Sequence, residues 1–416
     1  MRSVLFFGGL GSVSAFASRA DGAVPPTIVH VIADDLGYND LGFANGGKTH
    51  TPHIDAAVAA GISLTRYHTY KVCSPTRASI MTGRYPWGVG YYDMKGPEAV
   101  PLDFEMLPAL LKKQRGYQTH AVGKWNLGNL VKAYTPTFRG FDSFVGYYAA
   151  ALADYWYHGN PGKCKVSAGL TAPAFVTDLS NSSGANEAAG VRPATAPGVN
   201  GTYDLDVFAA DAVRRIEAHA AAQLKRRAAG EMEAGLYVYA AFQNVHSTAQ
   251  NPTTPSGSHP LHAPCHEVDT HYGTTRNDTY KVMGGMLTYL DYGVGNLTAA
   301  LEAAGRPYVL VLSSDNGGPL PHATNAPLRG GKHSLWEGGV RVRSFVSGSA
   351  VPAAARGTVW DGLAHSSDWV SKLEKHRAAV TEWCYRDKQA SRGRQLPLSP
   401  LLLTPPPLPA LPSQST

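Results

Sequence analysis

Polar side chains that could do chemistry follow four apolar segments of the chain. These segments indicate buried strands at Thr27–Ile32, Thr119–Val122, Gly235–Phe242 and Tyr308–Leu312. The polar residues that come after them are Asp34 and Asp35, Lys124, His246, and Asp315 with Asn316. Ligands of open α/β sheets bind at the carboxyl ends of the strands, so parallel strands would bring all of these side chains to one edge.

The acidic and amide members of this set offer only oxygen atoms to a ligand. Oxygen donors suit calcium or magnesium rather than zinc. The carboxylates of Asp34, Asp35 and Asp315 would also repel one another strongly unless a cation lay among them. Together with Asn316 they predict a site for a hard divalent cation. The alternative for either pair alone is that it caps a loop or a helix.

Cys73 lies where a helix is expected to begin. Ser74 suits the N-cap position and Pro75 the first turn. Arg77 follows one turn later, and the free N–H groups of a helix start together with a guanidinium favour an anion with tetrahedral oxygens. Lys332, in a glycine-rich segment, is a further cation available to such an anion. From the local sequence alone, a buried hydrophobic thiol and half of a disulfide remain alternatives for Cys73.

The elements that must position these residues alternate between strands and helices. Helices are expected at Ile54–Ala60, Leu107–Lys113, Asp206–Arg227 and Val282–Ala304. Such alternation predicts an α/β fold with a large, mostly parallel sheet covered by helices on both faces. Segments 160–202 and 247–279 are rich in Gly, Pro, Ser, Thr and Asn and are expected to be long surface loops. The Pro- and Leu-rich stretch 392–416 is expected to be an unpacked tail.

Composition excludes several classes of protein. The 416 residues are 44% hydrophobic, which is enough for a sizeable core. Lys and Arg number 37 against 31 Asp and Glu, and no long basic run concentrates the excess, so no nucleic-acid partner is expected. No internal stretch is long and apolar enough to cross a bilayer, so we expect no stable membrane insertion. The cysteine count of 4 excludes a disulfide-dense scaffold, although Cys164 could pair with Cys265.

The N-terminus has the features of a secretory signal. A positive start is followed by an apolar run and by small-residue cleavage sites, so residues 1–20 are expected to be a signal peptide. The alternative is a buried N-terminal strand. Secretion, or delivery to a periplasmic or lysosome-like lumen, implies an oxidising compartment that supplies calcium. It also makes four Asn-x-Ser/Thr sequons candidate glycosylation sites, at Asn181, Asn200, Asn277 and Asn296.

The segment around Cys73 resembles the sulfatase motif, a Cys-x-Pro-x-Arg sequence followed by Thr-Gly. Here it reads Cys73-Ser-Pro-Thr-Arg77 and then Thr82-Gly83-Arg84. The similarity runs from about Thr27 to Trp369, through Ala33-Asp-Asp-Leu-Gly-Tyr38, Gly123-Lys-Trp125, Gln243-Asn-Val-His246, Ser314-Asp-Asn-Gly-Gly318 and Ser334-Leu-Trp-Glu-Gly-Gly-Val-Arg341. The sequences of these motifs are most similar to those of the arylsulfatase B branch. The resemblance implies an alkaline-phosphatase-like sandwich, a catalytic domain at residues 25–370 and a divergent tail at 371–416.

The resemblance also implies a calcium-dependent sulfuric ester hydrolase of the arylsulfatase type. In that family a formylglycine-generating enzyme converts the motif cysteine, here Cys73, to formylglycine. The formylglycine hydrate attacks the sulfur of a sulfate ester substrate and forms a covalent sulfo-enzyme intermediate. Calcium would be bound by Asp34, Asp35, Asp315, Asn316 and the oxygen of residue 73. The other implied roles are positioning of the hydrate by Arg77, sulfate binding by Lys124 and Lys332, assistance to the leaving alcohol by His246, and proton acceptance by Asp315.

Two features depart from the family pattern. Asn126, in Gly123-Lys-Trp-Asn126, stands where the family has a His that partners the formylglycine hydroxyl and is implied in sulfate release. An amide cannot take a proton at neutral pH, so Asn126 is expected to slow turnover. The second departure is the stretch after Trp369, which does not resemble the family's smaller C-terminal domain. That domain is therefore expected to be missing or truncated.

These departures leave two alternatives to an active hydrolase. One is a catalytically impaired sulfatase-like protein that binds sulfated glycans without turning them over. The other is a phosphatase or phosphodiesterase of the same fold, although such enzymes usually place Ser or Thr at the nucleophile position. The leading prediction is hydrolysis of sulfate esters, with sulfated glycans as candidate substrates.

Overall fold

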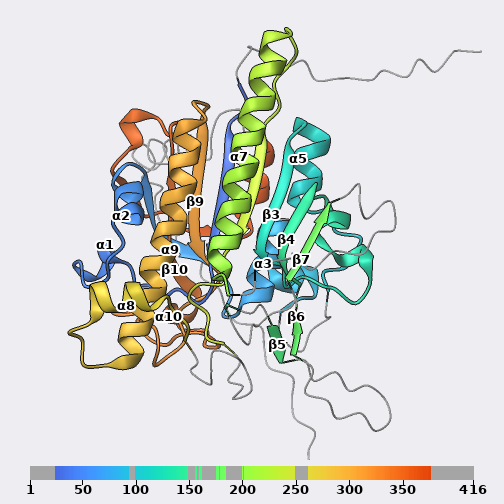
Figure 1. Ribbon diagram of the computed structural model, residues 1–416. Coiled ribbons are helices and arrows are strands. Elements are labelled where there is room, and N and C mark those ends of the chain that lie inside the picture. The colour runs from blue at the N-terminus through green and yellow to red at the C-terminus, as the bar shows by residue number, and fades with distance from the viewer. Residues whose placement is uncertain are drawn as a thin grey trace, which may run out of the picture.

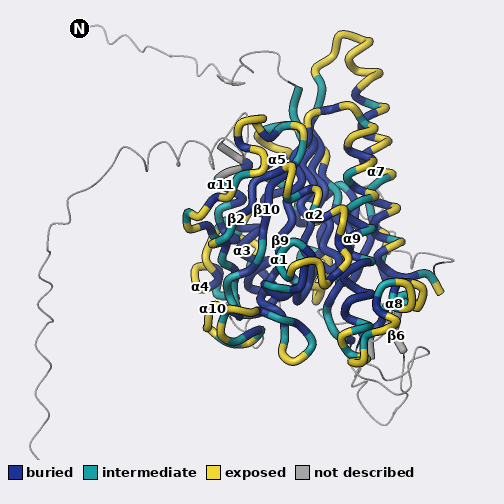
Figure 2. Tube along the Cα trace, turned by 90° about the vertical axis from the view of Figure 1, so that its left-hand side faces the viewer, coloured by how far each residue is buried: buried dark blue, intermediate teal, exposed yellow. Residues whose placement is uncertain are grey.

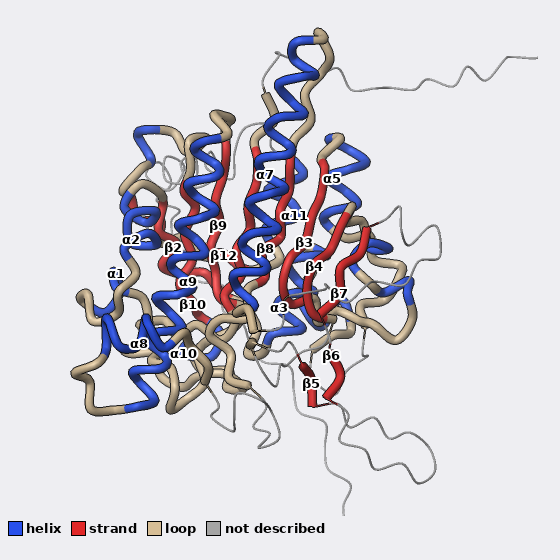
Figure 3. Tube along the Cα trace, in the orientation of Figure 1, coloured by secondary structure: helices blue, strands red, loops and turns tan. Residues whose placement is uncertain are grey.

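The computed structural model describes residues 24–92, 99–148, 155–156, 159–161, 175–177, 179–183, 199, 201–248 and 261–375. These residues form three layers, a sheet with helices on both sides (Figure 1). Figure 3 shows the strands as the central layer. The expected signal peptide, Cys164, Asn200 and the residues after 375 lie outside the described part of the chain.

Ten strands of the described chain form one mixed, mostly parallel sheet. Its order is β11 (Thr358–Trp360), β2 (Ile62–His68), β10 (Arg341–Ser347), β9 (Tyr308–Ser314), β1 (Thr27–Ala33), β8 (Leu236–Ala241), β3 (Gln118–Lys124), β4 (Ser143–Tyr147) and β7 (Leu179–Ser183), with β12 (Ala364–His365) paired to β2. Strands β9, β1, β8, β3 and β4 are parallel neighbours, whereas β10 and β7 run antiparallel to theirs. A separate antiparallel pair joins β5 (Gly159–Pro161) to β6 (Phe175–Thr177).

Two sets of helices cover the faces of the sheet. Val29 and Val31 of β1 belong to a core that includes α2 (Pro52–Ala59), α7 (Asp204–Ala228) and α9 (Asp278–Ala303). Ile28 and Ile32 point to the other face, where α3 (Cys73–Thr82), α5 (Leu107–Arg115) and α11 (Asp368–Lys375) pack. Because successive side chains of a strand alternate between faces, a doubly covered strand such as β1 is buried at every position. Figure 2 shows this buried centre inside a more exposed surface.

Local chemistry explains where the longer helices begin and end. The Asn277 side chain accepts a hydrogen bond from the Tyr280 N–H at 3.0 Å and caps α9. Helix α3 ends at Gly83, whose φ of +68° is left-handed and favours glycine. The remaining short elements are α1 (Gly42–Asn45), α4 (Pro86–Val89), α8 (Cys265–Tyr272), α10 (Glu337–Val340) and 3-10 turns at Lys132–Tyr134, Pro136–Arg139 and Ala353–Ala355. Within the described ranges, no helix is both long and apolar enough to cross a membrane.

The expected strands and helices all form, with ends that differ by a few residues, and the α/β class with a mostly parallel sheet is confirmed. The expectation of loops at 160–202 and 247–279 is wrong in part. Strand β7 lies in the first segment because Leu179 and Ser182 pack against β4 as an edge strand, which composition alone concealed. Helix α8 lies in the second segment and buries Glu267 and Tyr272.

The described residues also bear on the expected domain end, disulfide and glycosylation sites. The domain boundary at residue 370 falls inside α11, because Trp369, Val370 and Leu373 pack into the core. Cys265 is exposed and forms no disulfide with another cysteine of the described residues, and its expected partner, Cys164, lies outside them. The sequons within the described residues, Asn181, Asn277 and Asn296, are all exposed.

Candidate active site

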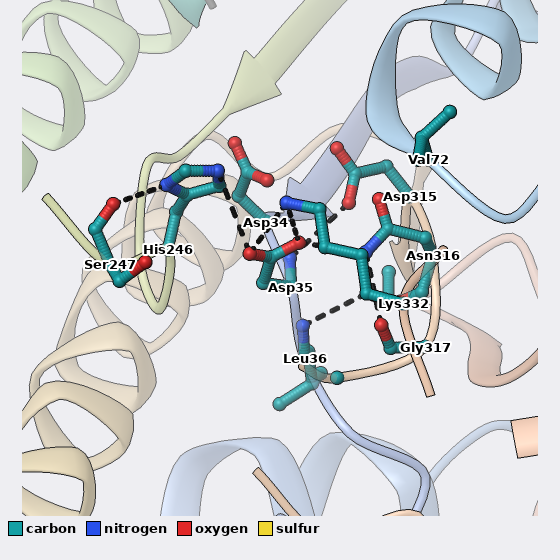
Figure 4. Close-up of polar contacts among 12 residues, drawn as sticks. Asp34, Asp35, Leu36, Val72, His246, Ser247, Asp315, Asn316, Gly317 and Lys332 are labelled. Atoms are coloured by element: carbon teal, nitrogen blue, oxygen red, sulfur yellow. Dashed lines mark hydrogen bonds and ion pairs between the residues drawn. The ribbon is translucent and has the colours of Figure 1, made fainter. Parts of the chain in front are cut away.

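The polar residues expected at the strand ends lie together at one edge of the sheet. Strands β9, β1, β8 and β3 are consecutive neighbours, so the residues that follow them share that edge. The close-up in Figure 4 shows Asp34, Asp35, His246, Asp315, Asn316 and Lys332 gathered there. Arg77 reaches the same place from α3, and Lys124 from the end of β3.

Arg77 links two of the carboxylates and is completely buried. Its Nη2 lies 2.7 Å from Asp315 Oδ2 and 3.2 Å from Asp34 Oδ2, and its Nε donates to Asp315 Oδ2 at 3.0 Å. Its Nη1 donates to the carbonyl oxygen of Lys124 at 3.0 Å. Burial alone would lower the pKa of Arg77, but the neighbouring acids, chiefly Asp315, outweigh it and raise that pKa. The guanidinium is therefore fixed and charged.

Two lysines also pair with the carboxylates, and Lys124 shares Asp34 Oδ2 with Arg77. Lys124 Nζ lies 2.6 Å from Asp34 Oδ2, and Lys332 Nζ lies 2.6 Å from Asp35 Oδ1. Burial acts to raise the pKa values of Asp34 and Asp35, but the surrounding cations hold both pKa values below the usual range. Both carboxylates are therefore ionised at neutral pH. The site then holds three negative side chains, Asp315 included, against three positive ones.

His246 has one ring nitrogen fixed and the other facing the acids. Its Nδ1 lies 2.5 Å from the Ser247 carbonyl oxygen, which can only accept, so Nδ1 carries the hydrogen. Its Nε2 lies 3.6 Å from Asp35 Oδ2 (Figure 4). Burial lowers the pKa of His246. The Tyr155 hydroxyl lies 2.7 Å from the His246 carbonyl oxygen and positions this turn. An isolated tyrosine carries no sequence signal for such a role, and Tyr155 was not predicted.

Two buried oxygen atoms in this site accept no hydrogen bond from the part of the chain that the structure describes. They are Asp34 Oδ1 and Asn316 Oδ1. The Asn316 amide is oriented by its Nδ2, which donates to Asp35 Oδ1 at 2.7 Å. Buried polar atoms are rarely left unpaired, and carboxylate and amide oxygens are ligands of hard cations. Ligand atoms of Asp34, Asp35 and His246 also lie within 4.8 Å of one another, which adds a residue that the sequence did not indicate as a metal ligand.

Cys73 is buried and is the first residue of α3. The N-cap is Val72, so the expectation that Ser74 would cap the helix is wrong. Ser74 is already helical, and its hydroxyl donates to Asn126 Oδ1 at 2.6 Å. Asn126 has a φ of +55°, a left-handed conformation that Asn adopts more readily than most residues. Asn126, which departs from the family pattern, is thus hydrogen-bonded to Ser74, the residue next to Cys73.

A tightly folded loop carries Lys332 into the site. The Lys332 N–H donates to the Gly318 carbonyl at 3.2 Å, and the His333 N–H donates to the Lys71 carbonyl at 2.8 Å. The second bond ties the loop to the segment that leads into Cys73. Gly330 has a φ of +84°, and a Cβ there would collide with side chains of the same loop, so this turn requires glycine.

The model of the family described as Sulfatase matches residues 26–376, which is most of the chain. The chain belongs to the sulfatase family. This sulfatase is 32% identical to arylsulfatase J of Mus musculus over 362 residues, which are 85% of this chain and 52% of that protein. It is 28% identical to the steryl-sulfatase of Mus musculus, over 77% of this chain and 57% of that protein. The chain spans about half the length of these curated relatives.

Solved structures confirm the fold of the sulfatase. Ps i-CgsB is similar with a TM-score of 0.67 and 27% identity, over 87% of this chain and 74% of that chain. The same protein in complex with k-i-k-neocarrahexaose gives a TM-score of 0.65. The PsFucS1 sulfatase from Pseudoalteromonas sp. shares the fold with a TM-score of 0.59 and 22% identity, over 84% of this chain and 66% of that chain. The alkaline-phosphatase-like class and the family expected from the Cys73 motif are therefore confirmed.

Proposed function

We propose that this sulfatase hydrolyses sulfate esters of glycans, using a bound calcium ion and a formylglycine formed from Cys73. The observation that carries the proposal is that Cys73, three carboxylates and three cationic side chains gather at one edge of the sheet. The charges of these side chains balance. A divalent cation would therefore give the site an excess positive charge, which favours a sulfate ester anion.

Asp34, Asp35, Asp315 and Asn316 are the proposed calcium ligands, with the oxygen of residue 73. The unpartnered Oδ1 atoms of Asp34 and Asn316 fit this assignment, and a donor set made mainly of oxygen favours calcium or magnesium over zinc. When bound, calcium supplies positive charge that stabilises the sulfate group as negative charge builds up on it.

The surroundings of Cys73 fit its conversion by a formylglycine-generating enzyme. Cys73 begins α3 and interacts electrostatically with Arg77 and Lys332, so a polar oxygen at this position would be stabilised. Formylglycine supplies a hydrate hydroxyl as the nucleophile toward sulfur. Arg77, held by Asp315 and Asp34, is rigid enough to orient that hydroxyl, and Asp315 is the proposed acceptor of its proton.

Lys124 and Lys332 are the proposed sulfate-binding residues. Their ammonium groups now pair with Asp34 and Asp35, which are also proposed to bind calcium. Cation binding at these carboxylates would free both ammonium groups to donate hydrogen bonds to sulfate oxygens. His246 is the residue proposed to assist the leaving alcohol, and it would do so through Nε2, because its Nδ1 is fixed by Ser247.

A glycan substrate is supported by the relative whose structure contains k-i-k-neocarrahexaose. We also propose that the protein is secreted or lumenal. The exposure of Asn181, Asn277 and Asn296 makes these sequons accessible to glycosylation. Asn277 uses Oδ1 to cap α9, and that bond leaves its Nδ2 atom for a glycan.

Sulfate release tests the proposed function. The full chain, produced in a secretory host that contains the formylglycine-generating enzyme, is incubated with an aryl sulfate and with sulfated oligosaccharides. We expect calcium-dependent turnover by the parent protein, none by Cys73→Ala, and a lower kcat/KM for Lys332→Met. Lys112→Met is the matched control, because Lys112 pairs with Asp142 on the surface and should leave turnover unchanged. No release by protein with verified formylglycine and calcium would contradict the proposal.

The hydrogen bond between Ser74 and Asn126 favours a second candidate function, which is binding of sulfated glycans without turnover. Asn126 cannot accept a proton at neutral pH, and its Oδ1 is already bonded. Saturable binding of sulfated oligosaccharides together with no sulfate release would support this candidate.

A further inference from the structure

The Lys332 loop exposes an aromatic and cationic pair. The Arg329 guanidinium lies 3.9 Å from the centroid of the Trp336 ring, and Trp336 is 52% exposed. The Gly338 N–H donates to the Arg329 carbonyl at 2.8 Å, and a Cβ at Gly330 would meet the Trp336 side chain at 2.9 Å. The same loop inserts Lys332 into the site. Trp336 is therefore held at a fixed place, four residues from a sulfate-binding lysine.

A series of contacts continues this surface to a second aromatic pair. Glu337, which follows Trp336, pairs with the His68 ring at 3.2 Å. In the ladder between β2 and β12, His68 lies opposite His365. The His365 ring lies 4.6 Å from the Tyr85 ring. Tyr85 is itself a member of the second pair.

The second aromatic pair is Tyr85 with Trp87, at the start of α4. Their rings are 4.7 Å apart and nearly parallel, with an interplanar angle of 5°. Trp87 is 65% exposed and Tyr85 is 47% exposed. Large aromatic side chains are usually buried, so two exposed pairs joined by contacts indicate a binding surface. We call this surface, from Trp336 through His68 and His365 to Trp87, the aromatic strip.

The chemistry of the aromatic strip suits a sulfated sugar chain. The faces of pyranose rings carry C–H groups that pack on aromatic rings, and guanidinium groups bind sulfate oxygens in pairs. Arg329 lies at one end of the strip, and Arg84, also exposed, precedes the Tyr85–Trp87 pair. The acid on the strip, Glu337, is offset by His68 and Arg341. Flat apolar faces with flanking cations are complementary to a polyanionic glycan.

We propose that the aromatic strip binds the sugar units next to the one whose sulfate ester lies at Lys332. The inference rests on the proposed function for the identity of the substrate. A strip with exposed aromatic rings at each end would contact more than one sugar. The protein should therefore prefer sulfated oligosaccharides over small sulfate esters, and longer chains over shorter ones.

Binding to the Cys73→Ala protein tests the strip without turnover. Affinities are measured by calorimetry for a size series of sulfated oligosaccharides. Trp336→Ala should weaken binding of all sizes by about ten-fold or more, the effect typical of a truncated aromatic anchor. Trp87→Ala should weaken binding of the longer chains more than that of the shortest. Trp336→Phe keeps a ring and should retain most of the affinity, which separates loss of stacking from collapse of the loop.

Leu224→Ala is the matched control, because Leu224 is 63% exposed near the end of α7, away from the site, and its loss should not change affinity. The proposal would be overturned if Trp87→Ala left the affinity for the longest sulfated chain unchanged. It would also be overturned if unsulfated oligosaccharides of the same length bound as tightly as the sulfated ones. If length-dependent binding holds but the parent protein, with verified formylglycine and calcium, releases no sulfate, the proposed function fails and the strip stands.

Discussion

Replacing Arg77 with Met should destabilise the protein strongly. Arg77 is fully buried and makes four hydrogen bonds at 2.7–3.2 Å, three of them to the carboxylates of Asp315 and Asp34. Methionine would fill much of the space but leave these two buried carboxylates without their shared cation. Breaking one side of a buried ion pair costs ~3–5 kcal/mol. For a domain of this size the melting temperature should fall by roughly 5 °C.

Calcium should reverse part of that loss. Removing one positive charge beside the proposed ligands strengthens their attraction for a cation. The rise in melting temperature on adding calcium should therefore be larger for Arg77→Met than for the parent protein. The assay is thermal unfolding, first in a chelator and then along a calcium titration. Arg139→Met is the matched control, because Arg139 is also buried but donates to the carbonyls of Pro101 and Phe104 and pairs with no described carboxylate.

Two results would refute this reasoning. If Arg77→Met melts at the parent temperature in chelator, the two carboxylates do not depend on Arg77 for compensation. If calcium shifts the parent and both variants by the same amount, Asp34 and Asp315 are not ligands of the ion.

Substitutions at Asn126, Asp35 and His30 test other parts of the molecule. Asn126→His restores a proton acceptor and should raise steady-state sulfate release at least about ten-fold, the lower edge for general-base assistance; an unchanged rate in an active enzyme would show that residue 126 does not limit turnover. Asp35→Asn removes one negative charge from the proposed ligands and should weaken calcium binding in calorimetry; stoichiometric zinc without calcium in the parent protein would mean that the site is misassigned. His30 is buried against Trp369, and burial lowers its pKa to about 3. The unfolded chain binds that proton first, so the stability associated with neutral His30 is present above pH 6.5 and is lost toward pH 3, by ~2 kcal/mol at pH 5. Between pH 6.5 and pH 3, His30→Phe should lose less of its free energy of unfolding than the parent protein does, as measured by denaturant unfolding. An equal loss in the two proteins would contradict the assignment of the low pKa to His30.

The strand ends were predictable from the sequence because their signals are local. An apolar run followed by Asp34–Asp35 or Asp315–Asn316 needs only the rule for parallel sheets to bring the pairs together. Arg77 and Lys332 were found through their spacing from Cys73 and through glycine-rich composition, and both lie in the site.

Other features depend on contacts distant in sequence. Strands β2 and β10 are only partly buried, so neither shows the continuous apolar run of β1. Tyr155 acts through hydrogen bonds to carbonyls 88 and 91 positions away, which no local pattern reveals. Ser74 was expected to be the N-cap of α3, but its hydroxyl bonds to Asn126 from another strand end. These roles are set by tertiary packing.

The most direct test relates turnover to the chemical state of residue 73. The protein is produced with graded amounts of the formylglycine-generating enzyme, and the mass of the peptide that spans Cys73 is measured in the same samples as sulfate release. We predict that the rate of release in calcium rises in proportion to the fraction of chains carrying formylglycine and extrapolates to zero for unconverted Cys73. A rate that is independent of that fraction, or full turnover by unconverted protein, would contradict the proposed function.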